Sequence, residues 1–166
     1  MQDETLERCL QALAVRPGAV KLDWRASVGC NEVIVHCHAG DVSKIVGRGG
    51  KTLNAIVRLG RSLYAPDRFT IPEVREVVGN QDEEKPFTYD QAVALFGEVC
   101  RAAFRRHVTV RTEEENVWVA QVDGELSRRT ATETATAIID LFEAIGLTMG
   151  MRGPHRLRVQ INAKTR

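Results

Sequence analysis

A basic, glycine-rich segment from Lys44 to Ile56, KIVGRGGKTLNAI, carries the residues most suited to chemistry in this chain. Its residues 47–50, GRGG, are called the glycine loop and stand between two apolar stretches with helical spacing. Backbone amides that open a helix have no partner within it and lie at the positive end of the helix dipole, which favours anions. Glycine has no Cβ, so a phosphate can approach the backbone closely. The glycine loop is therefore a candidate phosphate-binding site.

The charges of the chain are unevenly distributed. The net charge is +1, which argues against a protein that coats nucleic acid through bulk charge. Between Asp41 and Arg61, however, one acid stands against five cations. These cations are Lys44, Arg48, Lys51, Arg58 and Arg61. A local basic patch on a nearly neutral chain predicts a small site for an anionic ligand, with an affinity that falls as salt rises.

Helices and strands around the glycine loop can be predicted from hydrophobic spacing. Leu6, Leu10 and Leu13 form one stripe of an amphipathic helix, and Pro17 stops it. Asp41 is expected to cap the short helix before the glycine loop. Helical spacing predicts helices at 3–15, 41–47 and 51–64. Alternating or β-branched runs predict strands at 19–26, 32–38 and 67–71, the first two forming a hairpin.

A polar, acidic segment at 79–86 has the composition of a linker and divides the chain into predicted domains at 1–78 and 87–166. Thr88 and Gln91 have the spacing of a capping box at the start of the second domain. The elements predicted for this domain are helices at 87–104 and 125–146, and strands at 107–112, 116–122 and 156–162. Both halves thus have the order helix, strand, strand, helical region, strand.

The two halves also match each other at an offset of 82 residues, which places Ile56 over Ile138. The pattern TxxAIxxL begins at Thr52 in one half and at Thr134 in the other. Helices rich in alanine and threonine can match by chance, but the shared element order favours an internal repeat. At this offset the glycine loop corresponds to Arg129–Thr132, so the second copy lacks it.

The segment VIVHCHAGDVSKIVGRGGKTLNAIVRL, residues 33–59, resembles the type II KH domain and looks most like the small stand-alone KH proteins of bacteria. That family has the order helix, strand, strand, helix, GxxG, helix, strand. The resemblance implies an α+β fold with two tandem KH-like domains, the second degenerate. It also implies non-enzymatic binding of single-stranded RNA, of which the GxxG loop clamps about four nucleotides.

The resemblance gives each candidate residue a role. The glycine loop would form the clamp, nearby cations would neutralise phosphates, and apolar side chains would form a floor for the bases. One departure is that Arg48 is the only side chain between the outer glycines of the loop, which makes the loop more flexible. The implied RNA-binding residues are Ile34, His36, Val42, Lys44, Ile45, Val46, Gly47, Arg48, Gly49, Gly50, Lys51 and Arg58.

Other chemistries fit the sequence less well. Cys30, His36, Cys37 and His38 are zinc-type ligands, but on a strand His36 and Cys37 point to opposite faces. No serine or cysteine stands in a recognisable nucleophile motif, and GRGGKT lacks the GxxxxGK[ST] spacing of a nucleotide-binding loop. We therefore expect no catalytic residues, no metal and no cofactor.

Two hypotheses for the partner remain open. The first partner is single-stranded RNA, with single-stranded DNA also acceptable because phosphate and stacking contacts do not exclude it. The second hypothesis is a protein–protein assembly module, as a homodimer or with a KH-protein partner. No membrane partner is expected because no apolar run has the length of a spanning helix. The four scattered cysteines and the acidic N-terminal start predict a reduced, cytoplasmic protein.

Overall fold

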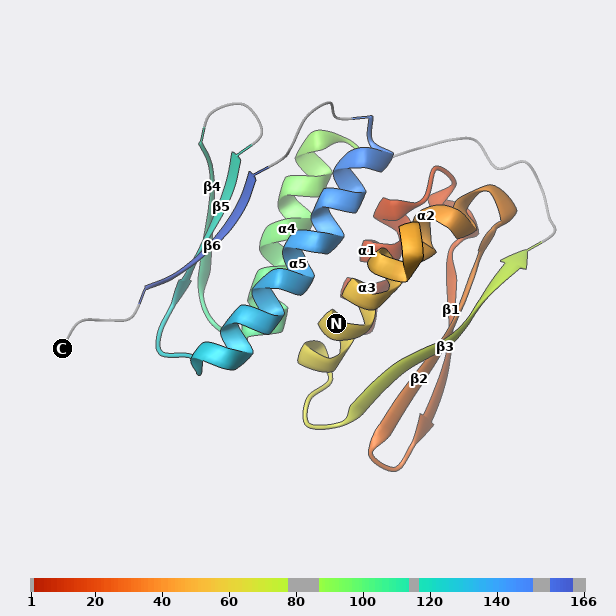
Figure 1. Cartoon of the computed structure of the whole chain (residues 1–166), viewed down its shortest axis with the longest axis horizontal. Coiled ribbons are helices and arrows are strands. Elements are labelled where there is room, and N and C mark those ends of the chain that lie inside the picture. The colour runs from red at the N-terminus through yellow and green to blue at the C-terminus, as the bar shows by residue number, and fades with distance from the viewer. Residues whose placement is uncertain (1, 78–86, 114–116, 151–155, 163–166) are drawn as a thin grey trace.

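The computed structural model describes residues 2–77, 87–113, 117–150 and 156–162, so the linker predicted at 79–86 lies outside the described residues. In residues 2–77, the first half contains three helices and three strands, with short 3-10 turns between some of them (Figure 1). Its elements are α1 (Gln2–Leu13), β1 (Lys21–Ser27), β2 (Cys30–His38), α2 (Val42–Val46), α3 (Lys51–Leu63) and β3 (Arg68–Val77).

The second half repeats this order without the short helix. Its elements are α4 (Tyr89–Phe104), β4 (Val108–Glu113), β5 (Val117–Asp123), α5 (Arg128–Thr148) and β6 (Arg156–Asn162). The predicted capping box at the start of α4 is confirmed, because the Thr88 hydroxyl accepts from the Gln91 amide and the Gln91 side chain accepts from the Thr88 amide. Within the described ranges, no helix combines the length and the apolar character needed to cross a bilayer.

Each half forms one three-stranded sheet with the same topology. In the first, β2 lies between β1, to which it is antiparallel, and β3, to which it is parallel. In the second, β5 lies between antiparallel β4 and parallel β6. A parallel third strand requires a crossover connection, which α2 and α3 supply in one half and α5 in the other. The predicted α+β class is confirmed.

Strand β3 is longer than the predicted strand at 67–71. It continues through Pro72 to Val77, and the pairing with β2 shifts register where Ile34 meets Glu73. A proline lacks the amide that a sheet ladder needs, but an edge strand with a bulge tolerates it. The proline therefore marks the bulge and does not end the strand.

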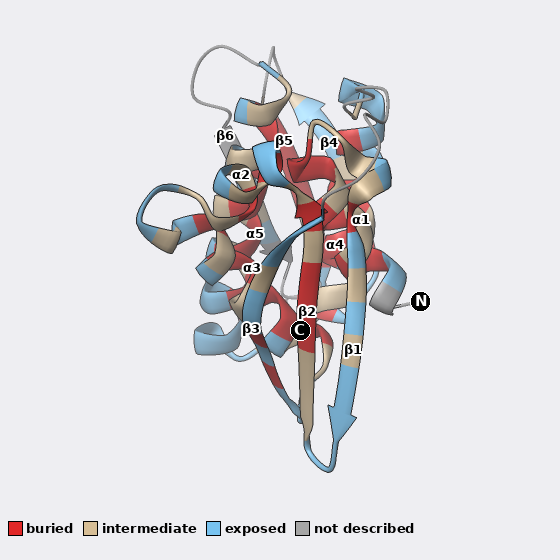
Figure 2. Ribbon diagram, turned by 90° about the vertical axis from the view of Figure 1, so that its right-hand side faces the viewer, coloured by how far each residue is buried: buried red, intermediate tan, exposed pale blue. Residues whose placement is uncertain are grey.

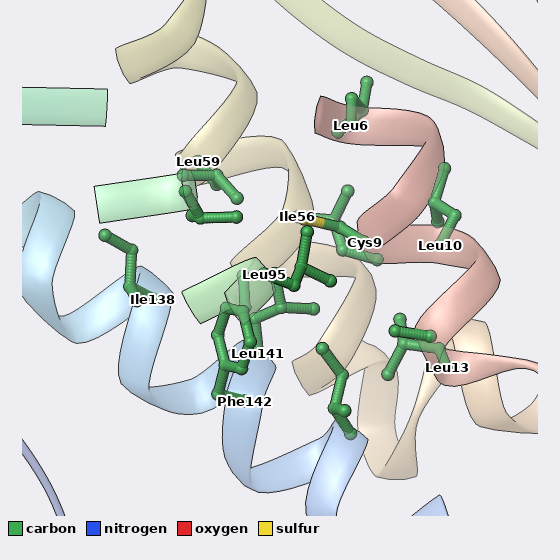
Figure 3. Packing of buried hydrophobic residues seen from close by; sticks show 14 of the residues in the cluster. Leu6, Cys9, Leu10, Leu13, Ile56, Leu59, Leu95, Ile138, Leu141 and Phe142 are labelled. Atoms are coloured by element: carbon green, nitrogen blue, oxygen red, sulfur yellow. The ribbon is translucent and has the colours of Figure 1, made fainter. Parts of the chain in front are cut away.

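The helices α1, α3, α4 and α5 fill the space between the two sheets, so the chain has the layers sheet, helices, sheet (Figure 1). Strand β2 has only buried and half-buried residues, whereas β1 beside it is mostly exposed (Figure 2). Buried side chains from all four helices meet in one continuous core (Figure 3). The labelled members include Cys9, Ile56, Leu59, Leu95, Ile138 and Leu141. The two halves therefore share a hydrophobic core.

The seam between α3 and α5 joins the halves with approximate two-fold symmetry. The helices are antiparallel, because Ser62 near the end of α3 bonds to Thr134 near the start of α5, at 2.9 Å. Arg58 donates to Asp140 at 2.8 Å, and these residues are 82 positions apart, the offset of the repeat. Other contacts are also matched, since α1 packs on α5 as α4 packs on α3. The predicted repeat thus corresponds to equivalent positions across one interface.

Candidate functional site

The glycine loop begins at Gly47, where the backbone has a conformation that only glycine adopts readily. Its φ of 75° and ψ of 170° end α2, and its amide donates to the Ser43 carbonyl at 2.9 Å. A Cβ on Gly47 would lie 2.2 Å from the Thr52 hydroxyl oxygen in the first turn of α3. The missing side chain therefore allows α2 and α3 to approach this closely.

The other two glycines of the loop leave the approach from solvent open. Gly49 and Gly50 have positive φ values of 63° and 77°, and a Cβ on either would meet nothing within 4 Å. Within the loop, Gly50 donates to the Gly47 carbonyl and Lys51 donates to the Arg48 carbonyl. Among the described residues, the amides of Arg48 and Gly49 donate to no backbone carbonyl. Two backbone donors are thus available beside the start of α3.

The cations around the loop differ in their pairing. Arg48 is exposed and forms no ion pair within the described ranges. The ammonium of Lys44 lies 3.5 Å from Asp41. Asp140 of α5 pairs with both Lys51, at 3.8 Å, and Arg58, at 2.8 Å. The second half thus places an acid in the basic patch, which the sequence analysis missed because the contact is long-range.

The apolar residues predicted as a floor for bases are placed in three different environments. Ile45 is fully buried in the core, so it supports α2 from inside and has no exposed surface. Val42 and Val46 are half-buried on α2.

Ile34 and His36 are separated from the loop. Val33, Val35 and Cys37 of β2 belong to the core under the helices, so the alternating Ile34 and His36 face the other side of the sheet. Together with α2, they do not line a single surface. The assignment of these two residues to the floor is therefore corrected.

A hollow of about 250 Å³ lies beside the glycine loop and is called the loop hollow. One wall comes from the first half and the other from the end of α5, where Leu147 is 73% exposed. The lining residues are Ser43, Lys44, Gly47, Arg48, Thr52, Ala144, Leu147 and Thr148. The second half thus supplies the apolar wall that Ile34 and His36 do not provide.

Asp41 positions the segment that leads into the loop. It occupies the position before α2, but its side chain makes no capping bond to that helix. Its fully buried carboxylate instead accepts from the amides of Val15 and Arg16, both at 3.0 Å. The predicted cap is corrected: the acid ties the segment after α1 to the start of α2, and Lys44 balances its charge.

Cys37 and Cys100 are buried thiols with a raised pKa. Burial raises the pKa of the Cys37 thiol to about 11 and that of Cys100 to about 12, so both thiols stay protonated near neutral pH. Cys37 and His36 lie on opposite faces of β2. In the part of the chain that the structure describes, no three histidine, cysteine or acidic residues are grouped so as to hold a metal ion.

The chain was also compared with known proteins. No protein-family model matches it. No curated protein matches it significantly. The functional assignment therefore rests on the geometry of the glycine loop and of the loop hollow.

Proposed function

We propose that this protein binds single-stranded RNA, without catalysis, at the glycine loop and the loop hollow beside it. The main support for this proposal is the structure of the glycine loop. Gly47 is fixed by packing against Thr52, while Gly49 and Gly50 leave space for a ligand on the solvent side. Two amides that have no backbone acceptor in the described part of the chain, the exposed Arg48 and the start of α3 then favour a phosphate.

The proposal extends to a type II KH domain in residues 1–78 and a degenerate KH-like domain in 87–166. Supporting it, the first half has the element order that the resemblance implies. The second half has the same sheet topology but continues as helix where the loop would be. Phosphate contacts do not exclude single-stranded DNA as a second ligand.

Bases of the bound strand would lie in the loop hollow. Its lining includes exposed Leu147 from α5 and the side chains of Ser43 and Thr52 from the first half. Apolar contact gives sequence-tolerant binding, since every base has an apolar face. A reduced cytoplasm is the compartment we propose, because all four cysteines are free thiols.

An assembly module is the second candidate, and one observation weighs against it. The exposed large apolar side chains of the described residues are Val28, Val77, Tyr89 and Leu147, which lie on four different elements or turns. Single exposed apolar residues do not make an interface. The face of α3 that would suit a partner already contacts α5 within the chain. Homodimerisation, or binding of a KH-protein partner, would then be a role in addition to RNA binding.

Fluorescence anisotropy with short single-stranded RNAs at two salt concentrations tests the proposal. Gly49→Asp should weaken binding at least about tenfold, because a carboxylate then repels phosphate at the clamp. The matched control is Gly29→Asp, in the turn between β1 and β2. Gly29 also has a positive φ, 71°, and open space around a Cβ. Gly29→Asp should therefore change the free energy of unfolding and the net charge as much as Gly49→Asp does.

The double variant Arg48→Asp, Gly49→Asp should abolish binding while circular dichroism stays unchanged. Salt-sensitive binding by the wild type that only the loop variants lose would support the clamp. Failure of the wild type to bind RNA, or equal losses in the loop variants and in Gly29→Asp, would reject it.

A further inference from the structure

A second hollow, of about 570 Å³, lies at the other end of the α3–α5 seam and is called the arginine hollow. Three arginines line it, together with three hydroxyl side chains. The arginines are Arg58 and Arg61 of α3 and Arg129 of α5, and the hydroxyls belong to Ser62, Thr130 and Thr134. Guanidinium and hydroxyl groups are the donors that bind phosphate oxygens.

The arginine hollow is the two-fold equivalent of the loop hollow. Adding 82 to Arg48 and Thr52 of the loop hollow gives Thr130 and Thr134 of the arginine hollow. Subtracting 82 from Ala144 gives Ser62 in the same way. Each hollow therefore combines the start of one half's long helix with the end of the other's.

Both hollows open on the same side of the molecule. The two-fold axis that exchanges two antiparallel neighbouring helices runs perpendicular to the plane that contains them. Rotation about this axis does not move a feature across the plane, so the two equivalent hollows lie on the same side of it. Along α3, Lys51 and Ser62 are 11 residues apart, which at the rise of an α-helix is roughly 16 Å. A single strand a few nucleotides long spans this distance.

The charge of the arginine hollow is positive. Arg61 is exposed and forms no ion pair in the described part of the chain. Arg129 contacts Glu133 at 3.1 Å on an exposed surface, and Arg58 contacts Asp140 at 2.8 Å. The exposed Arg129–Glu133 pair is weak and exchanges readily with another anion, whereas the Arg58–Asp140 pair is partly buried. Three cations against two acids leave a net positive charge.

We infer that the arginine hollow is a second phosphate-binding site, for the same RNA strand that the glycine loop binds. This inference rests on the proposed function. The strand runs along the α3–α5 seam, with one end at the backbone amides of the loop and the other at Arg61 and Arg129. The start of α5, with Arg58 and Arg61 from the end of α3, thus offers a phosphate site made of side chains, whereas the start of α3 offers one made of backbone amides.

The test compares RNAs of about four and about twelve nucleotides, the first long enough for the clamp alone. Arg61→Gln combined with Arg129→Gln should weaken the longer RNA about tenfold and lower its salt slope by about 0.7 for each lost phosphate contact. The short RNA should bind as it does to the wild type. Glu133→Gln should have the opposite effect and strengthen the longer RNA.

The matched control is Arg101→Gln on α4. Arg101 is also exposed and helical. The α4 residue that lines the hollow is Ala103. Because residues two apart in a helix point to nearly opposite sides, Arg101 faces away from the hollow. If the arginine variants bind the longer RNA like Arg101→Gln while the loop variants lose the short RNA, the second site is wrong and the proposed function stands. If the wild type binds neither RNA, both are wrong.

Discussion

Residues 47–50 and residues 129–132 occupy equivalent places in the two halves, yet they have different structures. The first segment interrupts the helical region between α2 and α3 as a loop of three glycines and one arginine. The second, Arg129–Thr132, is continuous α-helix, because α5 already begins at Arg128. In the loop, the amides of Arg48 and Gly49 have no backbone acceptor among the described residues, whereas in the helix three of the four side chains are exposed.

This difference shows how a repeated fold can present the same chemical property in two ways. Glycines expose the backbone and give a close, shape-dependent contact with a phosphate. A helix hides its backbone but projects long cationic side chains, which reach a phosphate without fixing its position. We therefore expect the loop to determine where a strand binds and the helix to contribute charge.

The largest expected effect is on stability, from Gly47→Ala. The variant must adopt a backbone conformation reserved for glycine, and its Cβ would clash with Thr52, so the free energy of unfolding should fall by about 3 kcal/mol. Urea unfolding followed by circular dichroism measures the change. The equivalent variant of the second half, Arg129→Ala, should be nearly neutral because the residue is an exposed helical one.

Gly49→Ala separates the two causes of this loss. Its φ is also positive, but its Cβ meets nothing within 4 Å. The expected cost is about 1 kcal/mol, from the left-handed backbone alone. Equal costs for Gly47→Ala and Gly49→Ala would mean that close packing of Gly47 on Thr52 does not stabilise the loop.

A smaller effect is expected on RNA affinity, from Asp140→Asn. This acid neutralises Lys51 and Arg58, so its removal should strengthen RNA binding about fivefold and steepen the salt dependence. Anisotropy titrations at two salt concentrations measure both. Asp23→Asn on the outer face of the first sheet removes the same charge and is the control. Unchanged or weaker binding by Asp140→Asn would show that the ion pairs do not compete with RNA.

The smallest expected effect is the coupling across the seam between Ser62 and Thr134. A double-mutant cycle with Ser62→Ala and Thr134→Val should give a coupling energy of about 0.5–1 kcal/mol, since their hydroxyls form one hydrogen bond with a buried partner. Thr136→Val with Ser62→Ala is the control pair, because Thr136 bonds within α5. A coupling energy as small as that of the control pair would show that this hydrogen bond does not help to hold the two halves together.

Local patterns were sufficient to predict much of the fold. The stripe of Leu6, Leu10 and Leu13 lies in α1, and the alternating segment before Ser27 lies in β1. The extension of β3 was missed because Pro72 usually ends a strand, whereas here it lies at a bulge on an edge. Whether a proline ends a strand depends on the position of that strand in the sheet, and the sequence of a single segment does not encode this position.

The site was less predictable because it depends on contacts between distant residues. The glycine loop is recognisable from its composition, but nothing local links Asp140 or Leu147 to it. The floor for bases included Ile34 because Val33, Ile34 and Val35 are all apolar, so the sequence lacks the alternation that distinguishes the two sides of a strand. Asp41 has the sequence of a cap, but its partners are in the segment that follows α1.

The core that Leu59 and Leu141 share across the seam has a consequence for how the chain can evolve. A substitution that opens a cavity in one half also removes contacts from the other, so compensating changes should arise in pairs related by the two-fold axis. Loss of the glycine loop from the second half removes none of these contacts. Selection on the fold of the first half is then enough to retain the second, whatever ligand it binds.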